Sequence, residues 1–210
     1  ETQARQPLGP LAENPPFTAA AEKNATKKPN KNPPLLFNLA ELQNECSKLF
    51  KLSPDETLKI VQELYEKKLV TYPRTDARVL SSAVAKEISK NIRGLLNYEH
   101  ANAFAGEILE QGSYKNIGKT RYVNDKQITD HYAIIPTGQG LGALKSLTVQ
   151  SARVYEVIVK RFLSIFYPPA VYQKISLVSV TEKERLFSSF KVLISPGYLK
   201  VTGYSFGKNK

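Results

Sequence analysis

The chain has 210 residues, a length that suffices for one or two domains with hydrophobic cores. A formal net charge of +11 and a pI near 9.6 favour an acidic partner, nucleic acid first. No apolar run approaches membrane-spanning length, and a single cysteine, Cys46, excludes an internal disulfide. Because the chain begins at Glu1 and contains no methionine, we expect it to be a fragment of a larger protein.

Residues 1–34 are rich in Pro, Ala, Asn and Lys, a composition typical of a flexible arm. A helical pattern follows. Asn38 and the Glu three residues later predict a capped helix that ends near Leu52, with Cys46 as a buried, unreactive thiol. Ser53 and Pro54 predict the start of a second helix. Two helices and a short strand in this order resemble a winged-helix unit, although plain helical packing would give the same apolar stripes.

The second helix runs into Leu69-Val70-Thr71 and then into Tyr72-Pro73-Arg74-Thr75-Asp76. Pro73 biases Tyr72 away from helical geometry, and an extended backbone would point Tyr72 and Arg74 to the same face. A phenol is a poor nucleophile at neutral pH because its pKa is ordinarily about 10. A neighbouring guanidinium favours the phenolate and binds phosphate through a planar fork of donors. The pair therefore suits attack on a phosphodiester, although a tyrosine after a short apolar run is more often a packing residue.

Further elements are expected downstream. Helical patterns begin at Ser81 or Ser82, cover residues 97–111 and are clearest over residues 148–167. Alternating residues then predict strands over 173–181, 186–194 and 198–204, with residues 182–184 as the turn between the first two. A lone Gly-x-Gly at residues 138–140 lacks the pattern of a nucleotide-binding loop.

His131 lies in the second informative stretch, which reads Ile-Thr-Asp-His-Tyr-Ala-Ile-Ile-Pro-Thr-Gly over residues 128–138. A lone histidine beside an apolar run is more often a core residue than a catalyst. Residues 65–76, however, resemble the active-site segment of type IA DNA topoisomerases, most closely the topoisomerase III branch. The stretch around His131 resembles the Asp-His-x-Ala-Ile-x-Pro segment of the same family. The chain departs from the family at Tyr132, where that branch commonly has a second histidine, and at Ala77, where serine is usual.

This resemblance covers roughly residues 33–203 and implies a multi-domain fold of helices and strands. A mainly helical, winged-helix-like domain that carries the catalytic tyrosine would be inserted in a β-rich arch domain. The implied parts are an N-terminal arm with part of the arch (1–36), the helical catalytic-tyrosine domain (37–168) and the return to the arch (169–210). Residues 17–20 would form an edge strand of the arch.

The resemblance also implies the chemistry. In the family, the tyrosine attacks one DNA strand and forms a 5′-phosphotyrosine bond, the other strand passes through the break, and the 3′ hydroxyl reseals it without ATP. Tyr72 would be this nucleophile, Arg74 would hold and neutralise the phosphate, and His131 would donate a hydrogen bond near the leaving group.

Other residues near the two motifs would support these three. Asp76 would orient or pair with Arg74, Thr75 would contact the backbone, and Asp130 would fix the tautomer of His131. The basic residues expected to contact DNA are Lys67, Lys68 and Arg78.

No acidic cluster in the sequence has the spacing of Mg²⁺ ligands, so we expect no metal-binding residue in this chain. The family carries its acidic cluster in a separate Toprim domain, so the resemblance implies Mg²⁺ bound outside this chain in the full-length enzyme. An isolated chain would then bind single-stranded DNA weakly without relaxing DNA. The expected partners are single-stranded DNA and the rest of the parent enzyme, with no membrane. The expected location is the bacterial cytoplasm, at the nucleoid.

Two other functions stay open at this point. One is a noncatalytic winged-helix-like DNA-binding module, in which Tyr72 belongs to the core. The other is a tyrosine nucleophile of the recombinase or type IB kind, which would leave a 3′-phosphotyrosine. That chemistry needs several arginines and histidines in a different arrangement, which this sequence does not match.

Overall fold

The computed structural model describes residues 30–180 and 185–203, and gives the backbone alone at 176–180 and 185–187. By their contacts, these residues form two units: residues 30–171 with 193–203, and residues 172–180 with 185–192. The strand expected at residues 17–20 and the turn expected at residues 182–184 lie outside the described residues. The division into an arm, a helical domain and a return to an arch remains a prediction.

Helices build the larger unit. They are α1 (Leu39–Phe50), α2 (Pro54–Glu66), α3 (Ser82–Gly94), α4 (Asn102–Gln111), α5 (Val149–Ser164) and the short α6 (Leu199–Thr202). Four 3₁₀ segments join them in the described part: η1 (Leu95–Asn97), η2 (Ser113–Lys119), η3 (Asp125–Gln127) and η4 (Leu141–Ser146). No helix among the described residues is long and apolar enough to cross a membrane.

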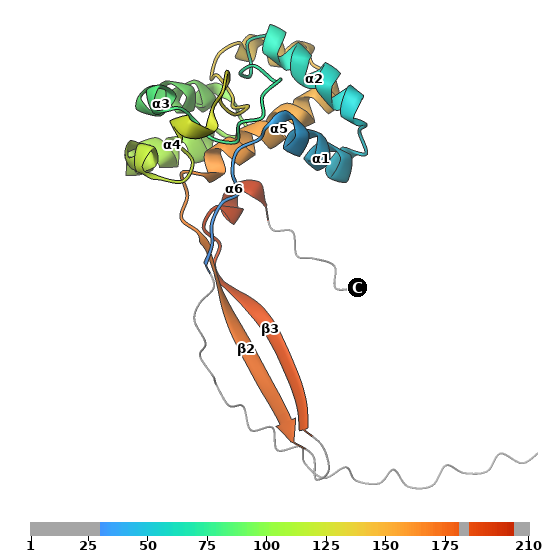
Figure 1. The fold of residues 1–210 in the computed structure, drawn as a ribbon, viewed down its shortest axis with the longest axis vertical. Coiled ribbons are helices and arrows are strands. Elements are labelled where there is room, and N and C mark those ends of the chain that lie inside the picture. Colours follow the sequence, from blue (N-terminus) through green and yellow to red (C-terminus); the bar gives the residue numbers. More distant parts are fainter. Residues whose placement is uncertain (1–29, 181–184, 204–210) are drawn as a thin grey trace, which may run out of the picture. The chain divides into compact units, whose positions relative to one another are not determined.

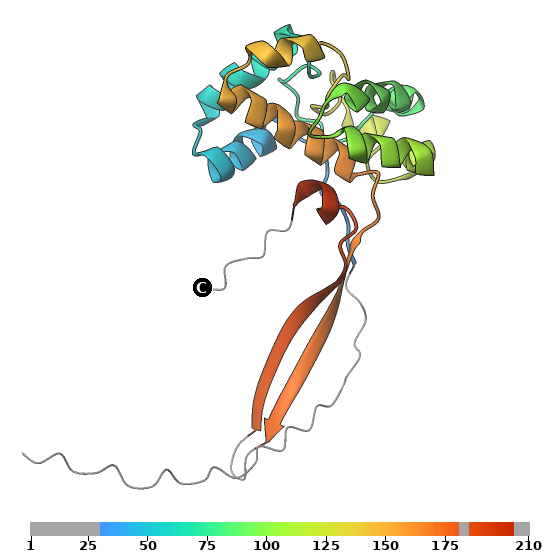
Figure 2. The same cartoon turned by 180° about the vertical axis from the view of Figure 1, so that it is seen from behind.

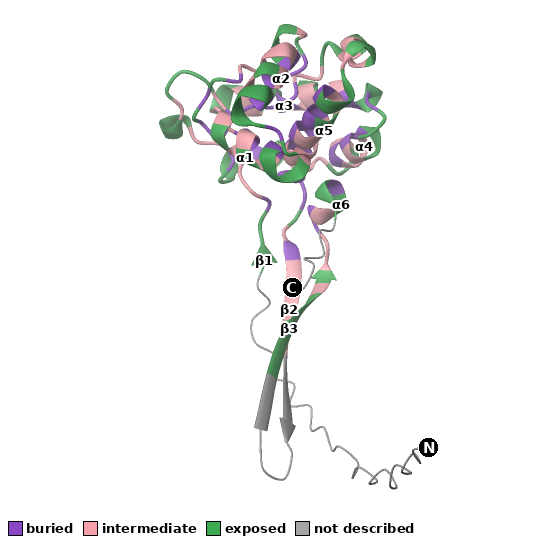
Figure 3. Ribbon diagram, turned by 90° about the vertical axis from the view of Figure 1, so that its right-hand side faces the viewer, coloured by how far each residue is buried: buried purple, intermediate pink, exposed green. Residues whose placement is uncertain are grey.

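Helix α5 lies at the centre of this unit. Its apolar face, from Val154 to Leu163, is buried, and α1, α2 and α6 all contact it. Figures 1 and 2 show α5 from opposite sides, with the α1–α2 pair on one side of it and the α3–α4 pair on the other. Figure 3 shows the buried residues gathered on the inward faces of these helices. Burial of this common face is the main stabilising contribution to the unit.

The predicted helix starts are confirmed. The Asn38 side chain accepts a hydrogen bond from the backbone N–H of Glu41 (2.9 Å). Ser53 and Glu56 form a complete capping box, in which the Ser53 hydroxyl accepts from the Glu56 N–H (3.2 Å) and the Glu56 carboxylate accepts from the Ser53 N–H (2.7 Å). Ser81 caps α3 in the same way. These bonds satisfy N–H groups that a helix leaves without internal partners.

Two sequence predictions need correction. The helix expected over residues 97–111 begins only at Asn102, because Leu95–Asn97 form a 3₁₀ turn and Tyr98 has extended backbone. The strand expected over residues 198–204 is wrong in its described part, which forms α6. The N–H of Leu199 donates to the carbonyl of Pro196 (3.0 Å), and that of Val201 donates to the carbonyl of Tyr198 (3.0 Å). Tyr198 and Val201 are buried three residues apart, which is helical and not strand spacing.

The two other predicted strands are confirmed as β2 (Ala170–Val180) and β3 (Arg185–Ser195). With β1 (Asn30–Lys31) they form a sheet in the order β1-β2-β3. Asn30 pairs with Val171 and Lys31 with Ala170 in antiparallel register. The described chain is thus a mixture of helix and sheet, as expected.

Cys46 is fully buried in α1, and burial raises the pKa of its thiol to about 11, against an opposing hydrogen bond with Thr57. The thiol is therefore protonated at neutral pH, and its access to solvent is closed. We expect no reaction with a thiol-specific disulfide reagent at pH 8 in the folded chain, and complete reaction in denaturant, measured by absorbance. Rapid labelling of the folded chain would contradict this placement.

Candidate active site

Two segments that lie far apart in the sequence are joined by backbone hydrogen bonds at the end of α2. The N–H of Thr71 donates to the carbonyl of Ile135 (3.0 Å), and the N–H of Thr137 donates to the carbonyl of Leu69 (3.0 Å). Val70 and Pro136 form the antiparallel bridge between these bonds. The short β-like run predicted before Tyr72 is thus one rung of an antiparallel pair, and its partner is the stretch that follows His131.

Threonine hydroxyls reinforce this pair along its length. Thr71 Oγ1 donates to the carbonyl of Ala133 (3.0 Å) and accepts from the N–H of Ile135 (3.0 Å). Thr75 Oγ1 donates to the carbonyl of His131 (2.8 Å) and accepts from the N–H of the residue two positions later (3.1 Å). Each hydroxyl therefore donates one hydrogen bond and accepts one, and each donated bond joins the two segments.

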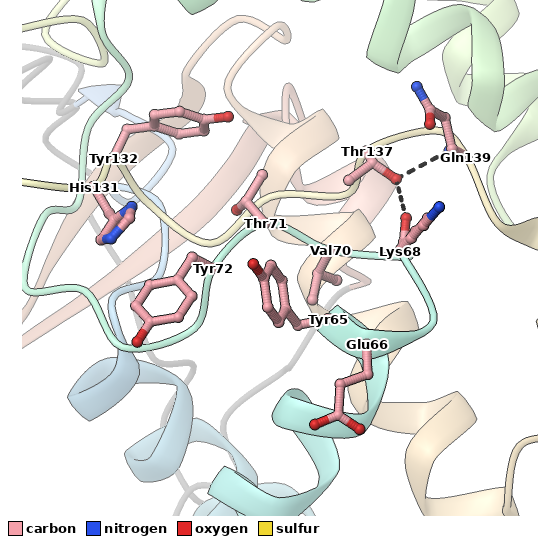
Figure 4. A pocket seen from close by; sticks show the side chains of 10 residues that line it. All are labelled: Tyr65, Glu66, Lys68, Val70, Thr71, Tyr72, His131, Tyr132, Thr137 and Gln139. Atoms are coloured by element: carbon pink, nitrogen blue, oxygen red, sulfur yellow. Dashed lines mark hydrogen bonds between the residues drawn. The ribbon is translucent and has the colours of Figure 1, made fainter.

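The two motifs meet as a row of aromatic rings. The ring centroids of Tyr72 and His131 lie 4.4 Å apart at an interplanar angle of 40°. On its other side, the Tyr72 ring meets the Tyr65 ring edge-on, with centroids 5.4 Å apart. Figure 4 shows the Tyr72 hydroxyl pointing away from Tyr65 and Tyr132. Among the described residues, no hydrogen bond occupies that hydroxyl.

An open pocket of about 570 Å³ lies beside these rings. Aromatic, polar and charged side chains from the end of α2 and from both paired segments line it. They are Tyr65, Glu66, Lys68, Val70, Thr71, Tyr72, His131, Tyr132, Thr137 and Gln139. Tyr72 and His131 are thus accessible to a ligand, and His131 is exposed and not a core residue.

Arg74 is exposed, and none of the ion pairs in the described part of the chain involves it. The extended backbone expected from Tyr72 to Arg74 is not found. Instead, the N–H of Thr75 donates to the carbonyl of Pro73 (3.0 Å), which closes a tight turn around Arg74. Asp76 is exposed and unpaired with Arg74 in the described structure; its carbonyl accepts from the Asn38 side chain (3.1 Å).

Some of the other predicted site residues form contacts within the protein, and others do not. Arg78 donates from Nε to the carbonyl of Leu36 (3.2 Å) and lies 3.5 Å from the Glu41 carboxylate. Lys67 pairs with its helical neighbour Glu63 at 3.7 Å. Lys68 and Asp130 are exposed, and no hydrogen bond joins the Asp130 side chain to His131 among the described residues. The DNA contacts and the role of Asp130 therefore remain predictions.

Comparison with known proteins identifies the family. A family model described as DNA topoisomerase matches residues 4–210. The chain belongs to that family. It is 37% identical over 169 residues to DNA topoisomerase 3 of Bacillus subtilis (strain 168), a match that covers 80% of this chain and 23% of that protein. It is 36% identical over 173 residues to DNA topoisomerase 3 of Bacillus licheniformis, which covers 82% of this chain and 23% of that protein.

The fold is similar to that of a solved topoisomerase. Full-length topoisomerase I from Thermotoga maritima aligns with a TM-score of 0.59 and 24% identity, over 88% of this chain and 29% of that one. The resemblance to type IA topoisomerases of the topoisomerase III branch is therefore confirmed. This member of the topoisomerase family spans 23% of the length of the two Bacillus relatives.

The resemblance implies Mg²⁺ bound outside this chain in the full-length enzyme, and that expectation remains a prediction. Within residues 30–180 and 185–203, no group of three or more His, Cys, Asp or Glu side chains could hold a metal ion.

The sequence did not predict the glycines that allow backbone segments to pack closely beside the site of this topoisomerase. A Cβ on Gly94 would clash with the carbonyl oxygen of Gly138, so the end of α3 touches the backbone that follows the His131 segment. Gly140, at φ +69°, packs against the carbonyl of Lys67. The Gly-x-Gly that matched no nucleotide-binding loop thus serves close backbone approach.

Gly94→Ala should destabilise the topoisomerase chain by roughly 1–3 kcal/mol, because the new methyl group overpacks the Gly138 contact by more than the helix gains. Gly106→Ala is the matched control. It also lies in a helix, but its Cβ would meet only a Leu96 methyl group at 3.9 Å. We expect the control to be neutral or up to about 1 kcal/mol more stable. Urea unfolding measures both, and equal stability of the two variants would contradict the close approach.

Thr75→Val should lower the free energy of unfolding by about 1–3 kcal/mol, because the valine leaves the His131 carbonyl and the Ala77 N–H without their partner. Thr75→Ser, which keeps the hydroxyl, should lose less than half as much. Hydrogen exchange at residue 77 should rise in the valine variant alone. An unchanged exchange rate there would show that the threonine bridge does not hold the two segments together.

Proposed function

We propose that this chain is the catalytic-tyrosine part of a type IA DNA topoisomerase that cleaves single-stranded DNA through a 5′-phosphotyrosine intermediate. The observation that supports it most is the contact of the Tyr72 and His131 rings, at 4.4 Å, beside an open pocket. Each residue comes from one of the two motifs that resemble the family, and the fold brings them together. In this proposal the helical unit is the winged-helix-like domain, and the chain around it belongs to a β-rich arch.

Tyr72 is the nucleophile in the proposed reaction. Its hydroxyl gives its proton to water, its oxygen forms a bond to phosphorus, and the bond from phosphorus to the 3′ oxygen of the upstream nucleotide breaks, so that this oxygen leaves as a hydroxyl. The downstream fragment stays on the protein through its 5′ phosphate. The same 3′ hydroxyl attacks in the reverse step, so one ester replaces another and no ATP is consumed. Between the two steps, the other strand passes through the break, which allows relaxation or decatenation.

Arg74 and His131 act on the charge that develops during this exchange. Arg74 is exposed on its tight turn and free to bind the nonbridging phosphate oxygens, as a guanidinium does well. His131 donates a hydrogen bond or proton to the departing 3′ oxygen. Its main chain is fixed by Thr75, so the supporting role of Thr75 in this proposal is to position His131.

The remaining roles concern binding. Lys68 is exposed at the pocket and Lys67 lies beside it, so both are suited to contact the DNA backbone. Arg78 serves mainly to join the segment after Tyr72 to α1, through Leu36 and Glu41. Mg²⁺ and its Toprim ligands would come from the rest of the parent enzyme, which acts in the bacterial cytoplasm at the nucleoid.

A covalent adduct tests the proposal. The full-length enzyme that contains this chain is incubated with single-stranded oligonucleotides labelled at either end, and then denatured. We expect the 3′ label to stay on the protein, because a 5′-phosphotyrosine retains the downstream fragment. Tyr72→Phe should abolish the adduct, while Tyr114→Phe, which changes a tyrosine outside the pocket, should leave it intact.

The other outcomes separate the alternatives. Retention of the 5′ label would indicate the recombinase or type IB chemistry. No adduct from either end, in an enzyme that still binds the oligonucleotide, would favour a noncatalytic DNA-binding module. In that case Tyr72→Phe would change stability alone.

A further inference from the structure

The pocket beside Tyr72 contains more than the proposed reaction uses. Tyr65, Tyr132 and Gln139 line it, yet none of them has a role in the attack on phosphorus or in the departure of the 3′ oxygen. Tyr65 is 38% exposed, so part of its ring is accessible to a ligand. Its ring already touches Tyr72 edge-on, so a ligand on its free surface would lie next to the reacting group.

The polar groups around the pocket are free to bind a ligand. In the part of the chain that the structure describes, no hydrogen bond occupies the hydroxyls of Tyr65 and Tyr132 or the side-chain amide of Gln139. The backbone of Gln139 is nevertheless fixed, because its N–H donates to the Thr137 hydroxyl (3.0 Å), which in turn donates to the Lys68 carbonyl (2.6 Å). A free amide on a fixed backbone suits hydrogen bonding with a defined partner.

The chemistry of the lining favours a nucleobase over a phosphate. Lys68 is the one lysine or arginine among the lining residues that the structure describes, and the Glu66 carboxylate lines the same pocket. A phosphate site would require more positive charge than this. Two tyrosine rings offer stacking surfaces for a planar base, and an amide presents a donor and an acceptor side by side, as the edge of a base does.

We propose that this pocket binds the base of a nucleotide adjacent to the scissile phosphate, with Tyr65 as its stacking platform and Gln139 reading its edge. The proposal rests on the proposed function for the position of the phosphate at Tyr72. Base binding here would hold the strand in register with the nucleophile and give the enzyme a sequence preference at one position of the cut site. The pocket volume, about 570 Å³, is within the range of small-ligand sites.

Photo-crosslinking tests this without requiring cleavage. A single 5-iodouracil is placed at successive positions of an oligonucleotide, bound to the full-length Tyr72→Phe enzyme, and the crosslinked residue is mapped by mass spectrometry. We expect one position next to the cut site to crosslink to Tyr65 or Tyr132. Crosslinks that map elsewhere from every position, or to these tyrosines equally from all positions, would overturn the proposal.

Two variants give independent readouts. Tyr65→Leu should weaken binding of the single strand roughly 5- to 150-fold, the range for loss of one stacked base, while the control Tyr114→Leu should not weaken it. Gln139→Ala changes an exposed side chain, so it should fold normally, and it should flatten the base preference at one position in the ladder of cut sites. An unchanged ladder together with unchanged affinity of Tyr65→Leu would sink the idea.

The adduct and crosslinking experiments can distinguish failure of the proposed reaction from failure of the proposed base site. Adducts without a crosslink in the pocket would leave the topoisomerase reaction in place and remove the base site. A position-specific crosslink without adducts would keep the base site and remove Tyr72 as the nucleophile.

Discussion

The site depends on the antiparallel rung between Leu69–Thr71 and Ile135–Thr137. Its two backbone hydrogen bonds, each 3.0 Å, connect the end of α2 to the segment that follows His131. A single rung would be marginal alone, because an isolated two-stranded pair is barely stable in water. Here, the threonine hydroxyls of both segments add bonds, and Leu69, Val70, Ile134 and Ile135 are all buried. The ring contact of Tyr72 with His131 follows from this register.

Some cationic side chains bind other groups of the chain, and others are exposed to solvent. Arg161 and Arg78 bind groups of the chain itself. The Arg161 guanidinium lies 4.0 Å from the Phe37 ring centroid and donates to the carbonyl of Leu35 (3.0 Å), while Arg78 joins α1 to the segment after Tyr72. Lys68, which lines the pocket, and Arg74 are exposed. The net charge of +11 therefore overstates the charge offered to a partner, and the position of the exposed cations matters more than their number.

Much of the fold was predictable because its features are local. Neighbouring residues are enough to predict the central helix α5, the long strands and the capped helix starts at Asn38, Ser53 and Ser81. The site motifs were also recognisable, through their resemblance to a family. The tight turn at Arg74 was not, since nothing in its neighbours distinguishes a turn from an extended backbone. Nor were the α6 helix and the Gly94–Gly138 approach, because a buried partner distant in sequence decides both.

The groups that hold the site together differ from the side chains that line the pocket, and this has an evolutionary consequence. Backbone groups and threonine hydroxyls hold the two segments, whereas the side chains of Tyr72, His131 and Gln139, with Tyr65 from α2, line the pocket. Substitutions at these pocket residues can therefore accumulate one at a time while the chain still folds. The same frame can thus give rise to sites that differ in chemistry or preference while the fold stays constant.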